Sequence, residues 1–228
     1  MSGWAIAAEA LAAVVVLGLL YALLLRPRGD VRATLSDFRD DTSMDERGAV
    51  RSVQAADLTI AAAELDAIWT PEHLERLART YWRFLSRATL GLIRVAYTPQ
   101  ERFVVLLTRP FVLLRFQAPE YELDAQCGLV RWRMERGVLV SRRGRGGGYL
   151  QIDVRRVPPG DDGRVTVHVE VEVTNFYPAI SGISRRVYTH TQSRIHVIVT
   201  HGFLRHLARL DLAESRIGRF RAPAAPVS

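Results

Sequence analysis

The feature that most constrains the fold of this chain is a strict alternation over residues 165–174. Odd positions are all valine, namely Val165, Val167, Val169, Val171 and Val173; even positions are polar, namely Thr166, His168, Glu170, Glu172 and Thr174. Successive side chains of a β-strand point to opposite faces, so this stretch predicts a strand with one apolar and one polar face. Sheets built from such strands are antiparallel and covered on one side only.

Further short strands are predicted upstream by the same period of two. They cover residues 102–108, 111–117, 120–127, 130–135, 138–143 and 150–155. Within 120–127 the odd positions are apolar, so we expect Cys127 to be buried as a small hydrophobe on the inner face. Together these strands predict an antiparallel sheet of about six or seven strands.

Two long helices flank the predicted strands. Thr70, Pro71 and Glu72 supply an N-cap oxygen, a proline at the first helical position and an acid in the first turn. Apolar residues at three- and four-residue spacing continue this helix to about Val95. A second helix is predicted over 185–210, and its apolar stripe would cover the sheet.

The order helix, antiparallel meander, long terminal helix predicts an α+β domain. This order of elements resembles the helix-grip fold of the START and polyketide-cyclase-like (SRPBCC) superfamily. The resemblance rests on the strands within 120–175 and on the helix at 185–210, which together make up roughly half the chain. The first strand of that fold is not evident, unless residues 52–60 supply it. The resemblance implies a pocket for a lipid, a sterol or another apolar ligand between the sheet and the terminal helix.

The amino-terminal run 4–25 carries one charged residue, Glu9. Its 22 residues make a helix of roughly 33 Å, enough to cross a hydrocarbon core of about 30 Å. A cleaved signal peptide is the main alternative, but no basic residue precedes the run. Arg26, Arg28 and Arg32 follow it, which predicts a single-pass anchor in the cell membrane with the amino terminus outside and the remainder cytoplasmic.

The rest of the chain divides by composition. Residues 26–56 mix acids and arginines that cancel, which predicts a polar linker. Residues 57–212 form the predicted α+β domain, and residues 213–228 form a disordered basic tail. The net charge of +7 is too modest to indicate a nucleic-acid partner.

If the domain holds an apolar ligand, the inward side chains of the strands and of the terminal helix would line its pocket. The candidates are Trp132, Met134, Ile152, Val167, Val169, Val171, Ile195, Ile198, Val199 and Phe203. The alternation is the same for a filled core, so the pattern leaves the existence of a cavity open.

We find no catalytic, metal or cofactor constellation. His190, His196, His201 and His206 are spaced by six, five and five residues, whereas ligands on one helical face need three or four. The strand pattern supplies almost no inward acid or base. Asp153, Glu170 and Glu172 fall on the polar face, where cross-strand charge pairing accounts for them.

A loop at residues 142–148 carries Arg142, Arg143 and Arg145 among glycines. It lacks the Lys-Ser/Thr ending of a phosphate loop. Either it is an ordinary hairpin loop, or its arginines contact anionic lipid at the membrane surface or an acidic partner.

Three functions remain open. The first is a membrane-anchored, non-catalytic module that binds an apolar ligand or lipid between sheet and helix. The second is a ligand-free domain that binds a protein partner at the membrane. The third is a cyclase-like enzyme, for which the strands supply almost none of the acid and base groups that catalysis needs.

Overall fold

The computed structural model describes residues 33–89, 91–106, 112–140, 145–157 and 163–176, together with Phe203, Leu204 and Leu207. The predicted anchor at 4–25, the basic tail at 213–228 and most of the terminal helix lie outside these residues. Among the described residues, no helix combines the length and the apolarity that crossing a membrane requires.

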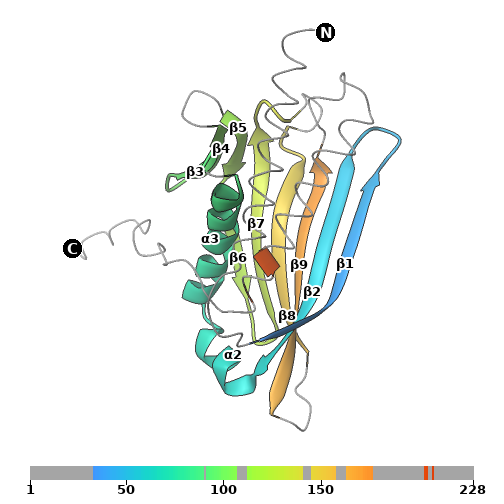
Figure 1. Ribbon diagram of the computed structural model, residues 1–228. Helices are drawn as coiled ribbons and strands as arrows, with labels where there is room; N and C mark the ends of the chain where they lie inside the picture. Colours follow the sequence, from blue (N-terminus) through green and yellow to red (C-terminus); the bar gives the residue numbers. More distant parts are fainter. Residues whose placement is uncertain are drawn as a thin grey trace, which may run out of the picture.

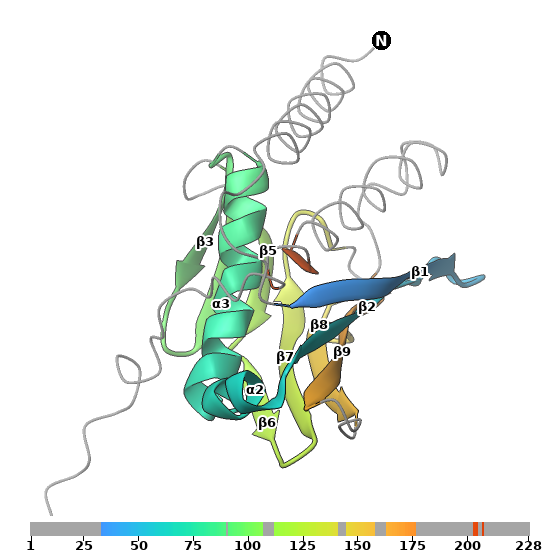
Figure 2. The same cartoon turned by 60° about the horizontal axis from the view of Figure 1, so that its bottom comes forward.

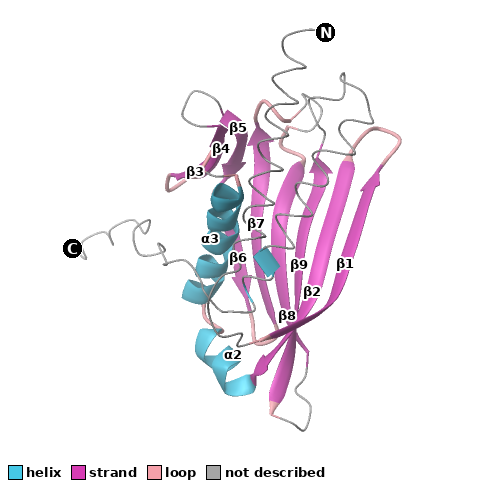
Figure 3. Ribbon diagram, viewed as in Figure 1, coloured by secondary structure: helices cyan, strands magenta, loops and turns pink. Residues whose placement is uncertain are grey.

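The strands build one nine-stranded antiparallel sheet in the order β1-β2-β9-β8-β7-β5-β4-β3, with β6 paired to β7. Helices α2 and α3 lie together on one face of it (Figures 1 and 3). The elements are β1 (Thr34–Met44), β2 (Val50–Ala61), α2 (Ala62–Ile68), α3 (Pro71–Ala88), β3 (Ile93–Tyr97), β4 (Glu101–Leu106), β5 (Val112–Gln117), β6 (Glu120–Leu123), β7 (Cys127–Arg136), β8 (Gly148–Val157) and β9 (Arg164–Phe176).

The predicted one-sided strand is confirmed in β9. Val165, Val167, Val169 and Val171 are buried, and Val173 is half-buried against the same core. Ile152 of β8 lies between Val171 and Val130 of β7, and all three side chains are completely buried. The core therefore follows the inner face of β7, β8 and β9, beneath the helices.

Helix α3 begins where the sequence predicts. The Thr70 Oγ1 accepts a hydrogen bond from the backbone N–H of His73 at 3.3 Å, so Thr70 caps the helix. Its predicted end at Val95 is wrong, because α3 ends at Ala88. Thr89 caps the last turn, Gly91 takes a positive φ of 77°, and Val95 belongs to β3, which pairs with β4.

The predicted polar linker at 26–56 is wrong from Thr34 onward, because β1 and β2 occupy most of it. Strand β2 pairs with β9 along its length and supplies the first strand of the predicted fold at residues 52–60. Its inward positions include Ser52 and Gln54, which are buried and joined by a 2.8 Å hydrogen bond. Strand β1 is an exposed edge strand. Because β1 is exposed and β2 buries polar side chains, neither strand shows a clean alternation of apolar and polar residues.

The predicted strand 120–127 is two strands, so Cys127 is exposed rather than buried. Asp124 ends β6, and its Oδ1 accepts hydrogen bonds from the backbone N–H groups of Gln126 and Cys127, both at 2.7 Å. The resulting tight turn resets the alternation. In β7 the even positions, including Val130, Trp132 and Met134, face the core.

The described part of the terminal segment contributes to the core. Phe203, Leu204 and Leu207 are helical and buried. The Phe203 ring meets the Tyr81 ring edge-on at 5.4 Å between centroids, which joins this segment to α3.

Candidate functional site

An apolar cavity of about 100 Å³ lies between the two helices and the sheet. Its lining includes residues at the end of α2 and at the start of α3. Figure 2 shows the corner at which these two helices meet. Its lining comprises Ala33, Leu58, Ile60, Leu65, Ile68, Trp69, Thr70, His73, Leu74, Leu77, Leu123, Val154, Val167, Val169 and Leu207.

Each wall of this cavity follows from a local pattern. Leu58 and Ile60 project inward from β2 at a spacing of two, and Val167 and Val169 do so from β9. Leu74 and Leu77 lie on one face of α3 at a spacing of three. The break between α2 and α3 at Trp69 and Thr70 separates the helix axes, and this corner leaves space that the aliphatic side chains do not fill.

The polar groups at the cavity rim are bonded to one another. The Trp69 Nε1 donates to the Asp124 carbonyl oxygen at 2.7 Å. The Thr70 Oγ1 lies 2.9 Å from the His73 Nδ1, and the His73 Nε2 lies 3.1 Å from an Arg76 guanidinium nitrogen. A guanidinium can only donate, so Nε2 accepts and Nδ1 carries the proton that it donates to Thr70.

His73 is accordingly held as a neutral imidazole. Burial lowers the pKa of His73, and the positive charge of Arg76 lowers it further. Both ring nitrogens are engaged, which leaves no free acid or base at the rim. As far as the described residues line it, the cavity therefore offers apolar contact and no unpaired charge to an incoming ligand.

The sequence-predicted pocket residues divide into three groups. Val167 and Val169 line the cavity. Trp132, Met134, Ile152, Val171 and Phe203 are buried in the continuous core instead. Ile195, Ile198 and Val199 lie outside the described residues.

Aromatic packing explains why the second group does not line the cavity. Trp82 of α3 meets Trp132 of β7 at 5.2 Å and Phe116 of β5 at 5.5 Å between ring centroids. These large rings fill the space between α3 and the sheet. The cavity is displaced toward α2 and β2, where the side chains are smaller.

Several residues that line the cavity were not predicted from the sequence as pocket residues. Leu58 and Ile60 lie in β2, and their alternation with polar Asp57 and Thr59 was a usable strand signal. Trp69 and His73 line the cavity because of the helix–helix corner. No local pattern marks such a corner.

The expectation of almost no inward polar groups is also wrong. Glu75 of α3 and Arg102 of β4 are buried. The guanidinium carbons of Arg79 and Arg102 lie 5.0 and 5.1 Å from the Tyr97 ring centroid. Burial lowers the pKa of Arg102 from its ordinary value. Sequence reasoning missed this cluster because its members come from separate elements.

The other candidates lie elsewhere. Asp57 and His168 pair across β2 and β9 at 2.6 Å, and Arg51 and Glu172 pair across the same strands at 2.8 Å. This confirms cross-strand charge pairing on the polar face. Asp153, by contrast, is buried and pairs with Arg155 of its own strand.

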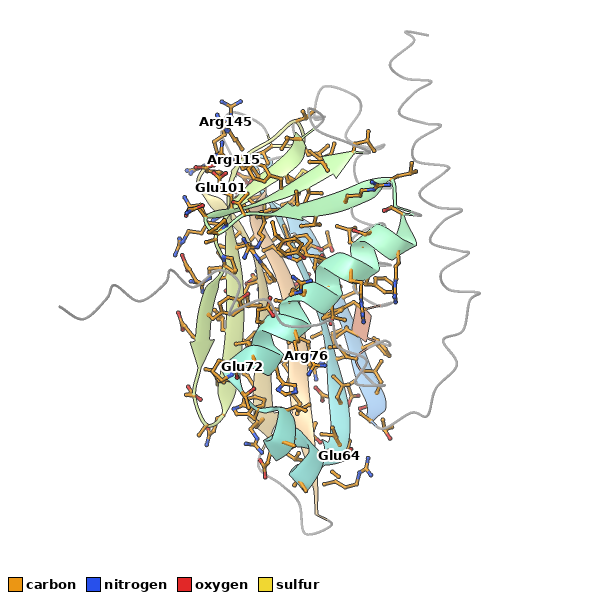
Figure 4. All side chains as sticks on the ribbon, turned by 90° about the vertical axis from the view of Figure 1, so that its left-hand side faces the viewer. Glu64, Glu72, Arg76, Glu101, Arg115 and Arg145 are labelled. Atoms are coloured by element: carbon orange, nitrogen blue, oxygen red, sulfur yellow. The ribbon has the colours of Figure 1, made fainter. Side chains whose placement is uncertain are left out.

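The predicted lipid-contact loop is described only from Arg145 onward, which is exposed at one end of the molecule (Figure 4). Arg142 and Arg143, like the four terminal histidines, lie outside the described residues. Within the part of the chain that is described, no group of three or more His, Cys, Asp or Glu side chains is arranged to hold a metal ion.

No family model and no curated protein matches this chain. Similar solved structures include a conserved protein from Geobacillus kaustophilus (9% identity, TM-score 0.35, 73% of this chain and 99% of that one). Another is truncated norcoclaurine synthase from Thalictrum flavum (12% identity, TM-score 0.34, 72% of this chain and 98% of that one). A third is human STARD10 (8% identity, TM-score 0.31, 75% of this chain and 73% of that one). Norcoclaurine synthase and STARD10 are therefore among the solved structures to which this chain is similar, as the predicted resemblance to START and SRPBCC proteins leads one to expect. At such identities and TM-scores the likeness carries no argument about ligand or activity.

Proposed function

We propose that this chain is a non-catalytic module that binds a small apolar ligand, or the apolar end of a lipid, in the cavity between α2, α3 and the sheet. The observation that carries the proposal is the lining, which is aliphatic and whose rim groups Trp69, Thr70 and His73 are bonded to protein partners. Among the described lining residues, a charged ligand would find no side chain of opposite charge. An apolar one gains about 25 cal/mol for each Å² that it removes from water.

The size of the cavity limits the ligand. Cavities of about 150 Å³ lined by Leu, Ile and Phe hold benzene. At about 100 Å³ the cavity of this chain accommodates a short alkyl segment. The terminal methylenes of one acyl chain meet this limit, whereas a whole sterol would require α2 or α3 to move.

The test compares two substitutions on the same face of β9. Val169 lines the cavity, whereas Val171, two residues on, is buried in the filled core. Val169→Phe should place its ring in the cavity, exclude the ligand and leave the free energy of unfolding within about 1 kcal/mol of the parent. Val171→Phe should overpack the core at a cost of about 1–3 kcal/mol and leave binding intact.

Binding is measured by native mass spectrometry of the full chain released from neutral detergent. The proposal expects a co-purified apolar molecule on the parent and on Val171→Phe, and none on Val169→Phe. Equal occupancy in all three proteins would refute it. A parent without any bound molecule would favour the alternative, a ligand-free domain that binds a protein partner.

We further propose that residues 4–25 tether this module to the cell membrane and that the domain lies on the cytoplasmic side. Two features of the sequence support this proposal. The apolar run is long enough to span a bilayer, and it is followed by Arg26, Arg28 and Arg32. Held at the bilayer, the exposed Arg145, with Arg142 and Arg143 beside it in sequence, would contact anionic headgroups.

A further inference from the structure

A second hollow, which shares no lining residue with the apolar cavity, lies between the carboxyl-terminal half of α3 and strand β3. These two elements lie side by side (Figure 4). The hollow has about 530 Å³ and is lined chiefly by Arg79, Trp82, Arg83 and Arg87 of α3 and by Val95 and Tyr97 of β3. We call it the α3/β3 groove.

The charge of the α3/β3 groove is of one sign. Arg79, Arg83 and Arg87 are spaced by four, so they stack along one face of α3. Like charges at this spacing destabilise a helix. Among the described lining residues none is a carboxylate. Arg79, Arg83 and Arg87 therefore bring positive charge to this face of α3.

Arg79 is held in place although two of its three guanidinium nitrogens lack an acceptor among the described residues. Its side chain is only 15% exposed, yet Nε and Nη1 find no hydrogen-bond acceptor among the described residues. The Glu75 Oε1 lies 3.8 Å from Nε, which makes an ion pair but is beyond hydrogen-bond distance. The guanidinium of Arg79 stacks on the Tyr97 ring, on which the Arg102 guanidinium also stacks, and this fixes its position.

Trp82 adds a second buried donor to the same groove. It is 3% exposed, and its Nε1 has no acceptor in the part of the chain that is described. Contacts with Trp132 and Phe116 hold the ring. The Trp132 Nε1 also lacks an acceptor, but Trp132 does not line the groove. Buried indole N–H groups usually have partners, so Trp82 indicates an acceptor supplied by a ligand.

We propose that the α3/β3 groove binds an oxyanion, the phosphate or carboxylate group of a ligand. Guanidinium and indole N–H groups only donate, and an oxyanion only accepts, so the two are complementary. Arg79 and Trp82 bind the oxyanion directly, while Arg83 and Arg87 add positive potential. Val95 and Tyr97 contact the body of the ligand. The volume is within the range of about 300–1,000 Å³ found for small-molecule sites.

The test measures the melting temperature of the full chain in neutral detergent with increasing inorganic phosphate or acetate, against chloride at equal ionic strength. A ligand that binds only the folded state raises this temperature, and the rise grows with the logarithm of the ligand concentration relative to Kd. Arg79→Gln removes the charged donor. Trp82→Phe removes only the N–H and keeps an aromatic ring. Arg94→Gln is the matched control, because Arg94 is an exposed arginine of β3 outside the groove.

The proposal expects phosphate or acetate to stabilise the parent and Arg94→Gln equally. Arg79→Gln should weaken the affinity about tenfold or more, the loss of one charge-assisted hydrogen bond. Trp82→Phe should weaken it by a smaller factor. An equal loss in Arg94→Gln would show unspecific charge attraction and overturn the proposal.

The source of the oxyanion is distinguished by a parallel arm with vesicles of neutral phospholipid, with and without phosphatidic acid. Arg79-dependent binding of the phosphatidic acid vesicles alone would identify a lipid headgroup. Arg79-dependent stabilisation by free phosphate or acetate would identify a soluble ligand. If neither probe binds in an Arg79-dependent way, the groove is not an oxyanion site, and the proposal for the apolar cavity is unaffected.

Discussion

Ile152 provides the sharpest test of how the sheet is organised. Its side chain is completely buried at the centre of β8, and its ladder neighbours Val130 and Val171 are completely buried as well. Ile152→Ala removes three carbons, worth about 2.5 kcal/mol in transfer free energy at roughly 0.8 kcal/mol each. The neighbouring strands hold the space open, so a cavity term adds to the loss and we expect about 4 kcal/mol in total.

The matched control is the adjacent residue. Gln151 lies on the opposite face of β8, and its Oε1 accepts a 2.8 Å hydrogen bond from the Arg131 Nε. Gln151→Ala should cost less than about 1 kcal/mol, because the bond is only partly buried. Urea unfolding of the full chain in neutral detergent, followed by tryptophan fluorescence, measures both. Equal losses for the two variants, or a loss below about 1 kcal/mol for Ile152→Ala, would refute the one-sided core.

Two further predictions concern the membrane and pH. The full chain should stay in the membrane fraction after carbonate extraction, and truncation before Ala33 should release it. A reporter fused after Ser228 should be active only in the cytoplasm. Release of the intact chain by carbonate would contradict the predicted membrane anchor. The folded-state pKa of His73 is below its unfolded value of about 6.5, so the stability it contributes is present above pH 6.5 and is lost as pH falls toward the folded pKa. His73→Gln should flatten the fall in unfolding free energy below pH 6.5, and an unchanged slope would show that His73 is not held neutral.

Where the apolar pattern is strict, the sequence predicts the structure well. The five valines of β9 and the even positions of β7 face the core as expected. The start of α3 at Thr70 and Pro71 was also predictable, because an N-cap is a local interaction between neighbouring residues.

Where polar side chains are buried, or where a turn shifts the alternation, sequence reasoning failed. The polar residues Ser52 and Gln54 made β2 resemble a linker in composition. The sequence does not reveal the hydrogen bond between their side chains, which are both buried. Asp124 moved Cys127 to the surface by ending one strand and starting another. Both errors concern side-chain hydrogen bonds between residues only two or three positions apart, which the alternation of apolar and polar residues does not reveal.

By itself the sequence determined that an antiparallel sheet with one apolar face packs beneath helices, because side-chain alternation and helix capping act within a few residues. Only the tertiary structure decided where space remains and where charge gathers. The cavity lies where α2 meets α3, and the α3/β3 groove lies where Arg79 of α3 meets Tyr97 of β3. Both depend on contacts between distant segments, and the volume and charge left over at such contacts are set by packing rather than by local sequence.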